Sequence, residues 1–328
     1  MPELTITLDR SVDVMRAIGE PTRARIVNVL SEGECSVSDL CDILGQSQPR
    51  ISRHLRLLVE AEVCARHREG NYVFFSLHRS EPTSHGAGSL VHLLISALDR
   101  DDPVLAADLA RLTTVRERRA EVAHQHFAEV AERWDRERTL HTPDELVEPA
   151  IVHLLSPNGH GIGDVLDIGT GTGRMIELLA PMANRIVGLD SNPSMLRVAR
   201  ANLDRASIHH AELRQSDIFA TSMPGSAFDV AVVHQVLHFL DDPARAIHAA
   251  ADLVVDGGRV LVVDLPRHSN EALRVEHAHR RLGFTSEQMN GWFADAGLLQ
   301  IDHQMVEPKG RQTGLIAVGL WIARKGAT

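Results

Sequence analysis

The sequence predicts two domains of different fold class: a mainly α-helical domain closed by a β-hairpin, then an α/β doubly wound domain with an antiparallel edge hairpin. Three observations support this prediction. Residues 1–80 carry apolar positions at helical spacing and end in two β-rich runs. From residue 150 onward, strand and helix patterns alternate. In VLDIGTGTGR, residues 165–174, an apolar strand ends in an acid and continues into three alternate glycines.

The bulk properties are typical of a globular protein. The chain has 328 residues, of which 44% are hydrophobic and 24% are charged, and it contains no run of about 18 apolar residues that would suit a membrane. In the first residues, MPELTITLDRSVD, no basic segment is followed by an apolar one, so we expect no export signal, and the three cysteines form no close-spaced pair. We therefore expect a cytoplasmic protein without a membrane partner. The net charge of −10 argues against indiscriminate coating of nucleic acid, but it permits a local basic face.

Four helical patterns precede the first hairpin. They cover residues 12–18, 23–30, 36–44 and 47–63. Pro21 is placed to open the second helix, Gly45 to end the third, and Ser47 to cap the fourth. The run VCARHREGNYVFFSL, residues 63–77, predicts two strands around a turn at EGN.

Two further helices are expected between the domains. GSLVHLLISAL, residues 88–98, is too apolar for a lone surface helix. Residues 109–138 carry charges of both signs, which predicts a solvated connecting helix that merges into the next domain at Phe127, Val130 and Trp134. The predicted division is thus a first domain over residues 1–80, a helical connection over 81–126 and a second domain over 127–328.

The second domain contains five strand patterns that alternate with helices, and then a hairpin. The five strands are expected at 164–168, 185–190, 211–217, 228–234 and 258–265. The last two β-like runs, LLQIDHQMV and GLIAVGLWIA, predict the hairpin at the sheet edge. This order indicates a parallel, Rossmann-like sheet with helices on both faces.

Residues 36–58 read as helix, tight turn and helix, and donor-rich side chains begin the second helix. A recognition helix meets base edges with the side chains of its first turns. The donor-rich side chains here are Ser47, Gln48, Arg50, Ser52, Arg53 and His54. Arg50 and Arg53 can each contact a guanine, and Gln48 an adenine, while Arg66 and Arg68 extend the basic strip onto the hairpin. The alternative is an ordinary helical hairpin with a polar face.

GEPTRARI and SQPRISRHL resemble the winged helix-turn-helix repressors of the ArsR/SmtB type, and the likeness covers about residues 8–78. The resemblance implies a homodimer on a palindromic, double-stranded operator, with residues 88–98 as the dimerisation helix. The family resemblance also suggests metal sensing. However, Ser36 and Ser38 stand where an arsenic-type site has cysteines, and serine offers no soft thiolate. The histidines of 124–126, 209–210 and 277–279 lack the partners and spacing of a metal cage, so we expect no metal.

The glycine loop indicates the class of ligand. A dinucleotide-binding loop reads G-x-G-x-x-G, but Arg174 stands where its last glycine would fall, and the pattern here is D-x-G-x-G-x-G. An acid at the strand end, Asp167, favours a ligand with a cationic ammonium group over a pyrophosphate. Asp190 ends the second strand, where a carboxylate accepts from ribose hydroxyls, and Asp217 ends the third. A β-carbon at Gly169 or Gly171 would occupy the ligand's space.

VLDIGTGTGRMIELLA, IVGLDSNPSML, FDVAVVHQVLHFLDDPARAI and GGRVLVVDL resemble the class I S-adenosylmethionine (SAM)-dependent methyltransferases, and the likeness covers residues 127–328. The resemblance implies a set of residues around SAM or S-adenosylhomocysteine (SAH). They are Asp167, Gly169, Gly171 and Gly173 at the methionine part, Asp190, Ser191 and Met195 at the ribose, Asp217 and Ile218 at the adenine, and His234 near the sulfur.

SAM binding does not by itself imply methyl transfer. No [ND]-P-P-[YF] motif follows the fourth strand, and no cysteine follows Cys64. His234, His238 and His277 are weak general-base candidates, and we assign no catalytic residue. EHAHRRLGF, residues 276–284, is expected to be helical, with Glu276, His277 and Arg280 placed to cap the cleft.

With both likenesses in one sequence, the chain resembles ArsR-type regulators that carry a fused methyltransferase-like domain. Those regulators respond to SAH and control methionine-cycle genes. The sequence therefore predicts a repressor that binds SAH or SAM as its effector. An active small-molecule methyltransferase with an autoregulatory winged helix is the alternative. A metal-responsive repressor is a third and weaker hypothesis.

Overall fold

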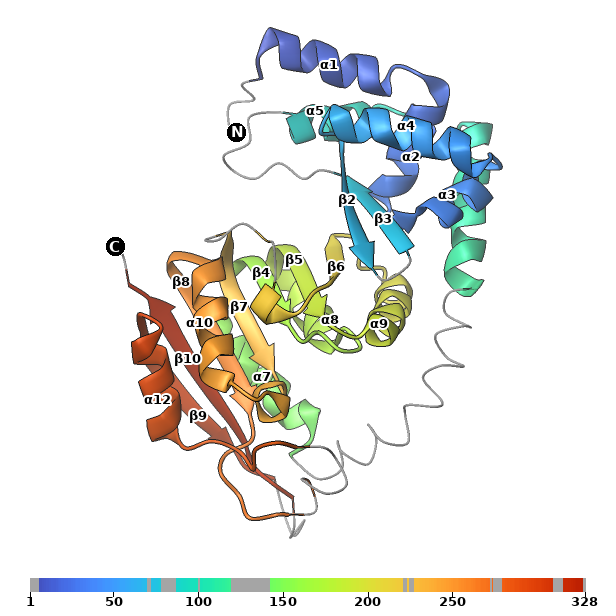
Figure 1. Cartoon of the computed structure of the whole chain (residues 1–328). Coiled ribbons are helices and arrows are strands. Elements are labelled where there is room, and N and C mark those ends of the chain that lie inside the picture. Colours follow the sequence, from blue (N-terminus) through green and yellow to red (C-terminus); the bar gives the residue numbers. More distant parts are fainter. Residues whose placement is uncertain are drawn as a thin grey trace. The chain divides into compact units, whose positions relative to one another are not determined.

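The computed structural model describes most of the chain (Figure 1). The described residues are 6–69, 72–77, 87–99, 101–118, 142–220, 223, 227–271, 273, 279–308 and 315–326. The chain divides into two compact units, Met1–Val122 and Ala123–Thr328. None of the described helices is both long enough and apolar enough to cross a membrane.

The first unit contains the expected helices and a small antiparallel sheet. Its elements are α1 (Leu8–Ile18), α2 (Pro21–Ser31), β1 (Cys35–Ser36), α3 (Val37–Leu44), α4 (Gln48–Glu60), β2 (Cys64–Glu69), β3 (Tyr72–Leu77), α5 (Ala87–Ser96) and a helix over residues 103–118. The sheet order is β1-β3-β2. Ile26, Leu40, Ile51 and Leu58 are fully buried between the helices, so the helix-turn-helix stands on a packed core.

Local chemistry explains where these helices begin and end. Pro21 occupies the first position of α2, and Ser36 and Asp39 form a capping box at the start of α3. Gly45 ends α3 in a left-handed conformation, with φ of 66°. α4 ends at Glu60, earlier than the expected residue 63, because Glu62 adopts φ of 51° and the Val63 N–H closes the helix on the Leu58 carbonyl.

The charged helix after α5 matches its prediction in part, over the residues that the structure describes. In its described part, residues 103–118, one face is solvated, with Arg111, Glu117 and Arg118 exposed, but Leu112 and Val115 on the other face are buried in the core of the first unit. The side chain of Asp108 is also fully buried there, because two arginines neutralise it. Residues 124–126 and the expected contacts at Phe127, Val130 and Trp134 lie outside the described residues.

The second unit is a seven-stranded sheet. Its strands are β4 (Gly163–Ile168), β5 (Ala183–Asp190), β6 (Ala211–Gln215), β7 (Phe228–His234), β8 (Val254–Asp264), β9 (Leu298–Val306) and β10 (Val318–Lys325). The sheet order is β6-β5-β4-β7-β8-β10-β9, and the first five of these are parallel. β10 runs antiparallel between β8 and β9, so the final hairpin lies at the sheet edge as predicted.

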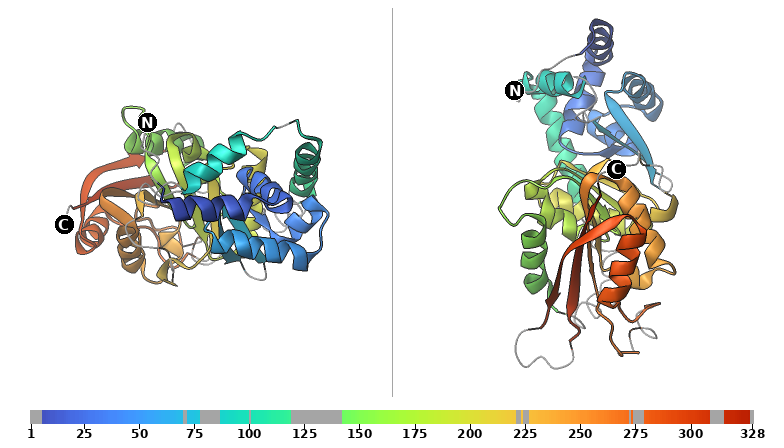
Figure 2. Two further views of the ribbon diagram at one scale, coloured as in Figure 1. Left: turned by 90° about the horizontal axis from the view of Figure 1, so that it is seen from above. Right: turned by 90° about the vertical axis from the view of Figure 1, so that its left-hand side faces the viewer.

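Helices cover both faces of this sheet (Figure 2). One face packs against α7 (Asp144–Leu155), α8 (Arg174–Leu179) and α9 (Pro193–Arg205). The other face packs against α10 (Pro243–Leu253) and α12 (Ser286–Asp295). The α/β doubly wound prediction is therefore confirmed.

Two local expectations in the second unit are wrong. β6 ends at Gln215, so Asp217 lies in the loop before the short 3₁₀ helix Ile218–Ala220 and does not end the strand. Residues 279–284 are not helical: Gly283 adopts φ of 74°, and Phe284 forms a bridge with Pro266. A β-carbon at Gly283 would lie 2.1 Å from the Pro266 carbonyl oxygen, which explains the glycine at this close approach. Residues 274–278 lie outside the described residues.

Candidate ligand site and candidate DNA interface

The glycine loop lies where the strand order of the parallel sheet reverses. β4 is flanked by β5 on one side and by β7 on the other, and the loop over residues 169–173 leads from β4 into α8. In open α/β sheets, ligands bind in the crevice outside the carboxyl ends of the strands at such a point. The order of the strands therefore places the loop in the position that a ligand site requires.

All three glycines of the loop have left-handed backbones, with φ of 74° at Gly169, 54° at Gly171 and 86° at Gly173. A β-carbon at Gly169 would lie 2.3 Å from Cγ2 of Val236, so this glycine is required by packing within the protein. At Gly171 the nearest atom to a β-carbon would be 3.9 Å away. The space beside Gly171 is therefore open, as expected for a glycine that leaves room for a ligand, whereas a side chain at Gly169 would meet Val236.

Asp167 is a buried carboxylate at the end of β4. Its residue is 1% exposed, and neither carboxylate oxygen has a hydrogen-bond partner within the described part of the chain. Burial raises the pKa of Asp167 to about 7; the nearby Thr170 hydroxyl opposes this shift, and the charge of Asp190 adds to it. A buried carboxylate without a partner is costly, and a cationic group that donates hydrogen bonds would offset that cost.

Asp190 connects the end of β5 to the glycine loop. Its Oδ2 accepts from the Gly171 N–H at 2.8 Å, and its Oδ1 accepts from the Asn192 N–H at 2.8 Å. Burial raises the pKa of Asp190, and these backbone hydrogen bonds oppose the shift. Each carboxylate oxygen has a second lone pair, so Asp190 can still accept from a ligand hydroxyl.

The other predicted ligand residues lie at the same edge of the sheet. Ser191 follows β5 and is exposed, and Met195 is half-buried in the first turn of α9. Asp217 is exposed and its Oδ1 accepts from the Phe219 N–H at 2.9 Å, while Ile218 is buried. His234 ends β7 and is half-buried.

A buried acid–histidine cluster, which the sequence analysis missed, lies at the end of β8. Asp264 is fully buried, and its Oδ1 lies 2.7 Å from Nδ1 of His238. The N–H groups of Leu237 and Leu265 donate to the same carboxylate at 2.9 and 2.7 Å. The run VLVVDL carried the signal that identified Asp167 and Asp190, an apolar strand that ends in an acid.

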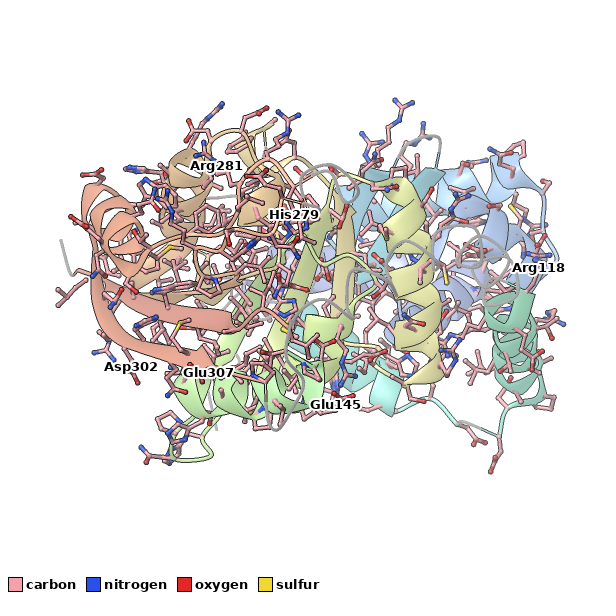
Figure 3. All side chains as sticks on the ribbon, turned by 90° about the horizontal axis from the view of Figure 1, so that it is seen from below. Arg118, Glu145, His279, Arg281, Asp302 and Glu307 are labelled. Atoms are coloured by element: carbon pink, nitrogen blue, oxygen red, sulfur yellow. The ribbon has the colours of Figure 1, made fainter. Side chains whose placement is uncertain are left out.

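Two more histidines surround His238. The ring of His238 stacks on that of His279, with centroids 4.2 Å apart, and both residues are buried. The pKa of His268 is lowered by burial and by its proximity to His279 and His238. The backbone N–H groups of Arg280 and Arg281 donate to the His238 carbonyl. Figure 3 labels His279 and Arg281 of this segment. His238 is therefore tied into the fold, and His277 lies outside the described residues.

The candidate DNA interface is the start of α4 together with β2. Five of the predicted residues at the start of α4 are exposed: the N-cap residue Ser47, and Gln48, Arg50, Ser52 and Arg53 of the helix itself. Arg66 and Arg68 are exposed on β2. His54 differs, because its side chain is 13% exposed and its Nδ1 lies 3.4 Å from the Glu20 carboxylate. His54 thus faces the cap of α2 and is poorly placed to reach a base.

The serines at the positions of an arsenic-type site have structural partners. Ser36 caps α3, and its hydroxyl lies 2.8 Å from that of Ser38. Over the described residues, no group of three or more histidine, cysteine or acidic side chains is arranged to hold a metal ion.

Two family models match the chain. Residues 20–63 match the bacterial regulatory protein, arsR family, and residues 166–262 match a methyltransferase domain. The transcriptional repressor SdpR of Bacillus subtilis is 38% identical over 66 residues, which cover 20% of this chain and 73% of SdpR. The ubiquinone biosynthesis O-methyltransferase of Pseudomonas paraeruginosa is 30% identical over 197 residues, which cover 55% of this chain and 82% of that protein.

Other relatives are matched over a smaller share of their length. The chain spans 57% to 66% of the ubiquinone biosynthesis O-methyltransferases from several further bacteria. Among solved structures, a chain of the complex between the Haloferax volcanii Trm112 methyltransferase activator and a methyltransferase has a TM-score of 0.50 and 17% identity, and the match covers 62% of this chain and 98% of that one. This likeness concerns the fold alone. The chain belongs to the arsR family of bacterial regulatory proteins through its first unit, and its second unit is a domain of the methyltransferase family.

Proposed function

We propose that this chain is a homodimeric, cytoplasmic transcriptional repressor of the ArsR type whose second unit binds SAH or SAM as an effector. The operator is a palindromic, double-stranded DNA site, and the genes under control belong to methionine and SAM metabolism. On this proposal the ligand changes operator affinity, and methyl transfer is not the main role.

The observation that supports SAH or SAM as the ligand is the buried carboxylate of Asp167, which has no hydrogen-bond partner among the described residues. SAH and SAM each bring a cationic amino group and a ribose diol. The amino group would meet Asp167, and the diol would meet Asp190, which sits beside the open Gly171. SAM, when bound, supplies an electrophilic methyl group that SAH lacks. The residues present therefore fit an adenosyl amino acid.

The first unit supports the proposal that the chain binds operator DNA as a homodimer. Exposed Arg50, Arg53 and Gln48 begin α4, and the relative SdpR is named a transcriptional repressor. Large apolar side chains are exposed on α1 and α5, with Met15 at 48% and Leu93 at 62%. A second copy that covers these side chains would gain the free energy of their burial, which supports a homodimer.

SAH and SAM differ by one methyl group and one positive charge, so the site can respond to one more strongly than to the other. A methyl-sized wall discriminates by about 1–3 kcal/mol, judged from single methylene differences in snug pockets. Such a difference suits a sensor of the ratio between the two compounds.

The second candidate is an active small-molecule methyltransferase. It is favoured by the relatives that are named O-methyltransferases, and by the Asp264–His238 pair at the carboxyl edge of the sheet. An imidazole held by a carboxylate can serve as a general base. The burial of His238 beneath Phe239 and His279 opposes this role.

The experiment that separates the candidates combines calorimetry with a transfer assay. SAH and SAM are titrated into the wild type and into Asp190→Ala, and labelled methyl transfer is measured on a panel of small hydroxyl and amino acceptors. The proposal predicts binding to the wild type, loss of binding in Asp190→Ala with unchanged ligand-free operator binding, and no turnover above background. Turnover well above background would favour the methyltransferase instead.

A further inference from the structure

A buried carboxylate in the first unit joins the helix over residues 103–118 to α2. The side chain of Asp108 is fully buried in this helix. Arg25 of α2 donates to it twice, from Nε to Oδ2 at 2.6 Å and from Nη2 to Oδ1 at 2.7 Å. Arg111, one turn further along the helix, donates to Oδ1 at 2.5 Å. One carboxylate therefore fixes the direction of two guanidinium groups.

Both guanidinium groups also contact the C-terminal end of α3. Nη2 of Arg25 donates to the Leu44 carbonyl at 3.3 Å, and Nε of Arg111 donates to the Ile43 carbonyl. These carbonyls belong to the last turn of the helix, where no intrahelical N–H is available to them. The end of α3 is thus held by two side chains that Asp108 orients.

This end of α3 leads directly into the short turn before the recognition helix. Gly45 follows Leu44 with φ of 66°, and α4 begins at Gln48. A displacement of the Ile43 and Leu44 carbonyls changes the path of this short turn. It therefore changes the direction of α4, whose first side chains form the candidate DNA interface.

The same helix carries the chain toward the second unit. Leu112 and Val115 pack in the core of the first unit, and Arg118, labelled in Figure 3, pairs with Asp42 at 2.6 Å. After residue 118 the chain continues to the methyltransferase-family domain. Any force or rotation that reaches the first unit along the chain itself arrives through this helix.

We propose that Asp108 and Arg111 are positioning residues that couple the ligand state of the second unit to the direction of recognition helix α4. Movement of the helix over residues 103–118 shifts the two guanidinium groups, and these shift the last carbonyls of α3. The inference rests on the proposed function, because it requires a ligand response in the wild type. It adds the route of that response within the first unit.

Four variants test the route. Arg111→Gln removes the guanidinium that contacts Ile43 and leaves the buried Asp108–Arg25 pair intact, so it folds even where Asp108→Asn does not. Arg111→Lys retains a charged donor. Arg118→Ala, on the same helix, removes an ion pair whose two side chains are 62% and 49% exposed, and it serves as the matched control.

For each variant, operator Kd is measured by fluorescence anisotropy with and without saturating SAH or SAM, and ligand Kd by calorimetry without DNA. The response is the ratio of the two operator Kd values, and we expect at least about fivefold in the wild type. Arg111→Gln and Asp108→Asn should bring the ratio to within twofold of one, with ligand Kd unchanged, whereas Arg111→Lys and Arg118→Ala should keep it.

The inference is overturned if Arg111→Gln keeps the wild-type ratio. A change of both operator Kd values by the same factor keeps that ratio, and it is what a merely structural role would produce. A wild-type ratio of one contradicts the proposed function itself, and that outcome is visible before any variant is compared.

Discussion

Replacement of Asp167 by asparagine should change how the stability of the second unit depends on pH. The folded-state pKa of Asp167 is raised from 3.8 to about 7. Between pH 4 and 7 the folded protein therefore retains a proton that the unfolded chain has lost, and the free energy of unfolding falls as the pH rises through this range. Above pH 7 the folded state bears the full cost of a buried charge.

The magnitude follows from the size of the shift. About three pKa units correspond to roughly 4 kcal/mol in total, of which about 2–3 kcal/mol develops between pH 5 and pH 8. An asparagine side chain has nearly the same shape as aspartate and does not ionise, so the variant lacks this pH dependence. The stability of Asp167→Asn relative to the wild type should therefore rise by about 2–3 kcal/mol from pH 5 to pH 8.

Urea unfolding followed by tryptophan fluorescence is the suitable assay. The sequence has three tryptophans, all within the second unit, and two of them, Trp292 and Trp321, pack in or against its core, so these two report its unfolding. The measurement is made without ligand at pH 5 and pH 8. A difference between variant and wild type that is the same at both pH values would refute the assignment of Asp167 as a buried carboxylate without compensation.

Three further predictions concern other residues. Arg53→Ala should weaken operator binding by about 1–3 kcal/mol in anisotropy titrations, whereas His54→Ala should have less effect because His54 faces Glu20; equal losses would contradict this assignment. Gly169→Ala should destabilise the second unit because its β-carbon would meet Val236, whereas Gly171→Ala should chiefly abolish ligand binding. Urea unfolding measures the first effect and calorimetry the second. Intact ligand binding in Gly171→Ala would count against the site. Asp264→Ala should lower the free energy of unfolding by about 2 kcal/mol or more, since it leaves two buried backbone N–H groups and His238 without an acceptor; a loss below about 0.5 kcal/mol would contradict this role.

Much of the fold was predictable because its signals are local. Pro21 and Gly45 mark helix ends through their own backbone chemistry, and the alternation of apolar strands with helices indicated a parallel sheet. Ser47 is the N-cap residue of α4 as expected, but its side chain makes no capping hydrogen bond. The end of α4 was predicted too late because Glu62, which is not a glycine, takes the left-handed position. Sequence pattern alone does not reveal such an exception.

The arrangement of the candidate ligand site was also largely predictable, since acids at the ends of successive parallel strands must lie at one edge of a sheet. Asp167 and Asp190 were found in this way, and the same rule would have found Asp264. The role of the charged helix was not predictable. Its pattern of charges indicated a solvated face, which Arg111, Glu117 and Arg118 have, but it did not indicate the buried pairing of Asp108 with Arg25, 83 positions earlier in the chain. Only tertiary structure brings those charges together.

The most direct test of the central claim is the operator affinity of the wild-type protein, measured at one salt concentration with SAH, with SAM and without ligand. If the second unit is a sensor, one of the two compounds should change operator Kd by at least about fivefold, and the other should change it less. Equal operator Kd values in all three conditions, with calorimetry showing that both compounds bind, would contradict the account.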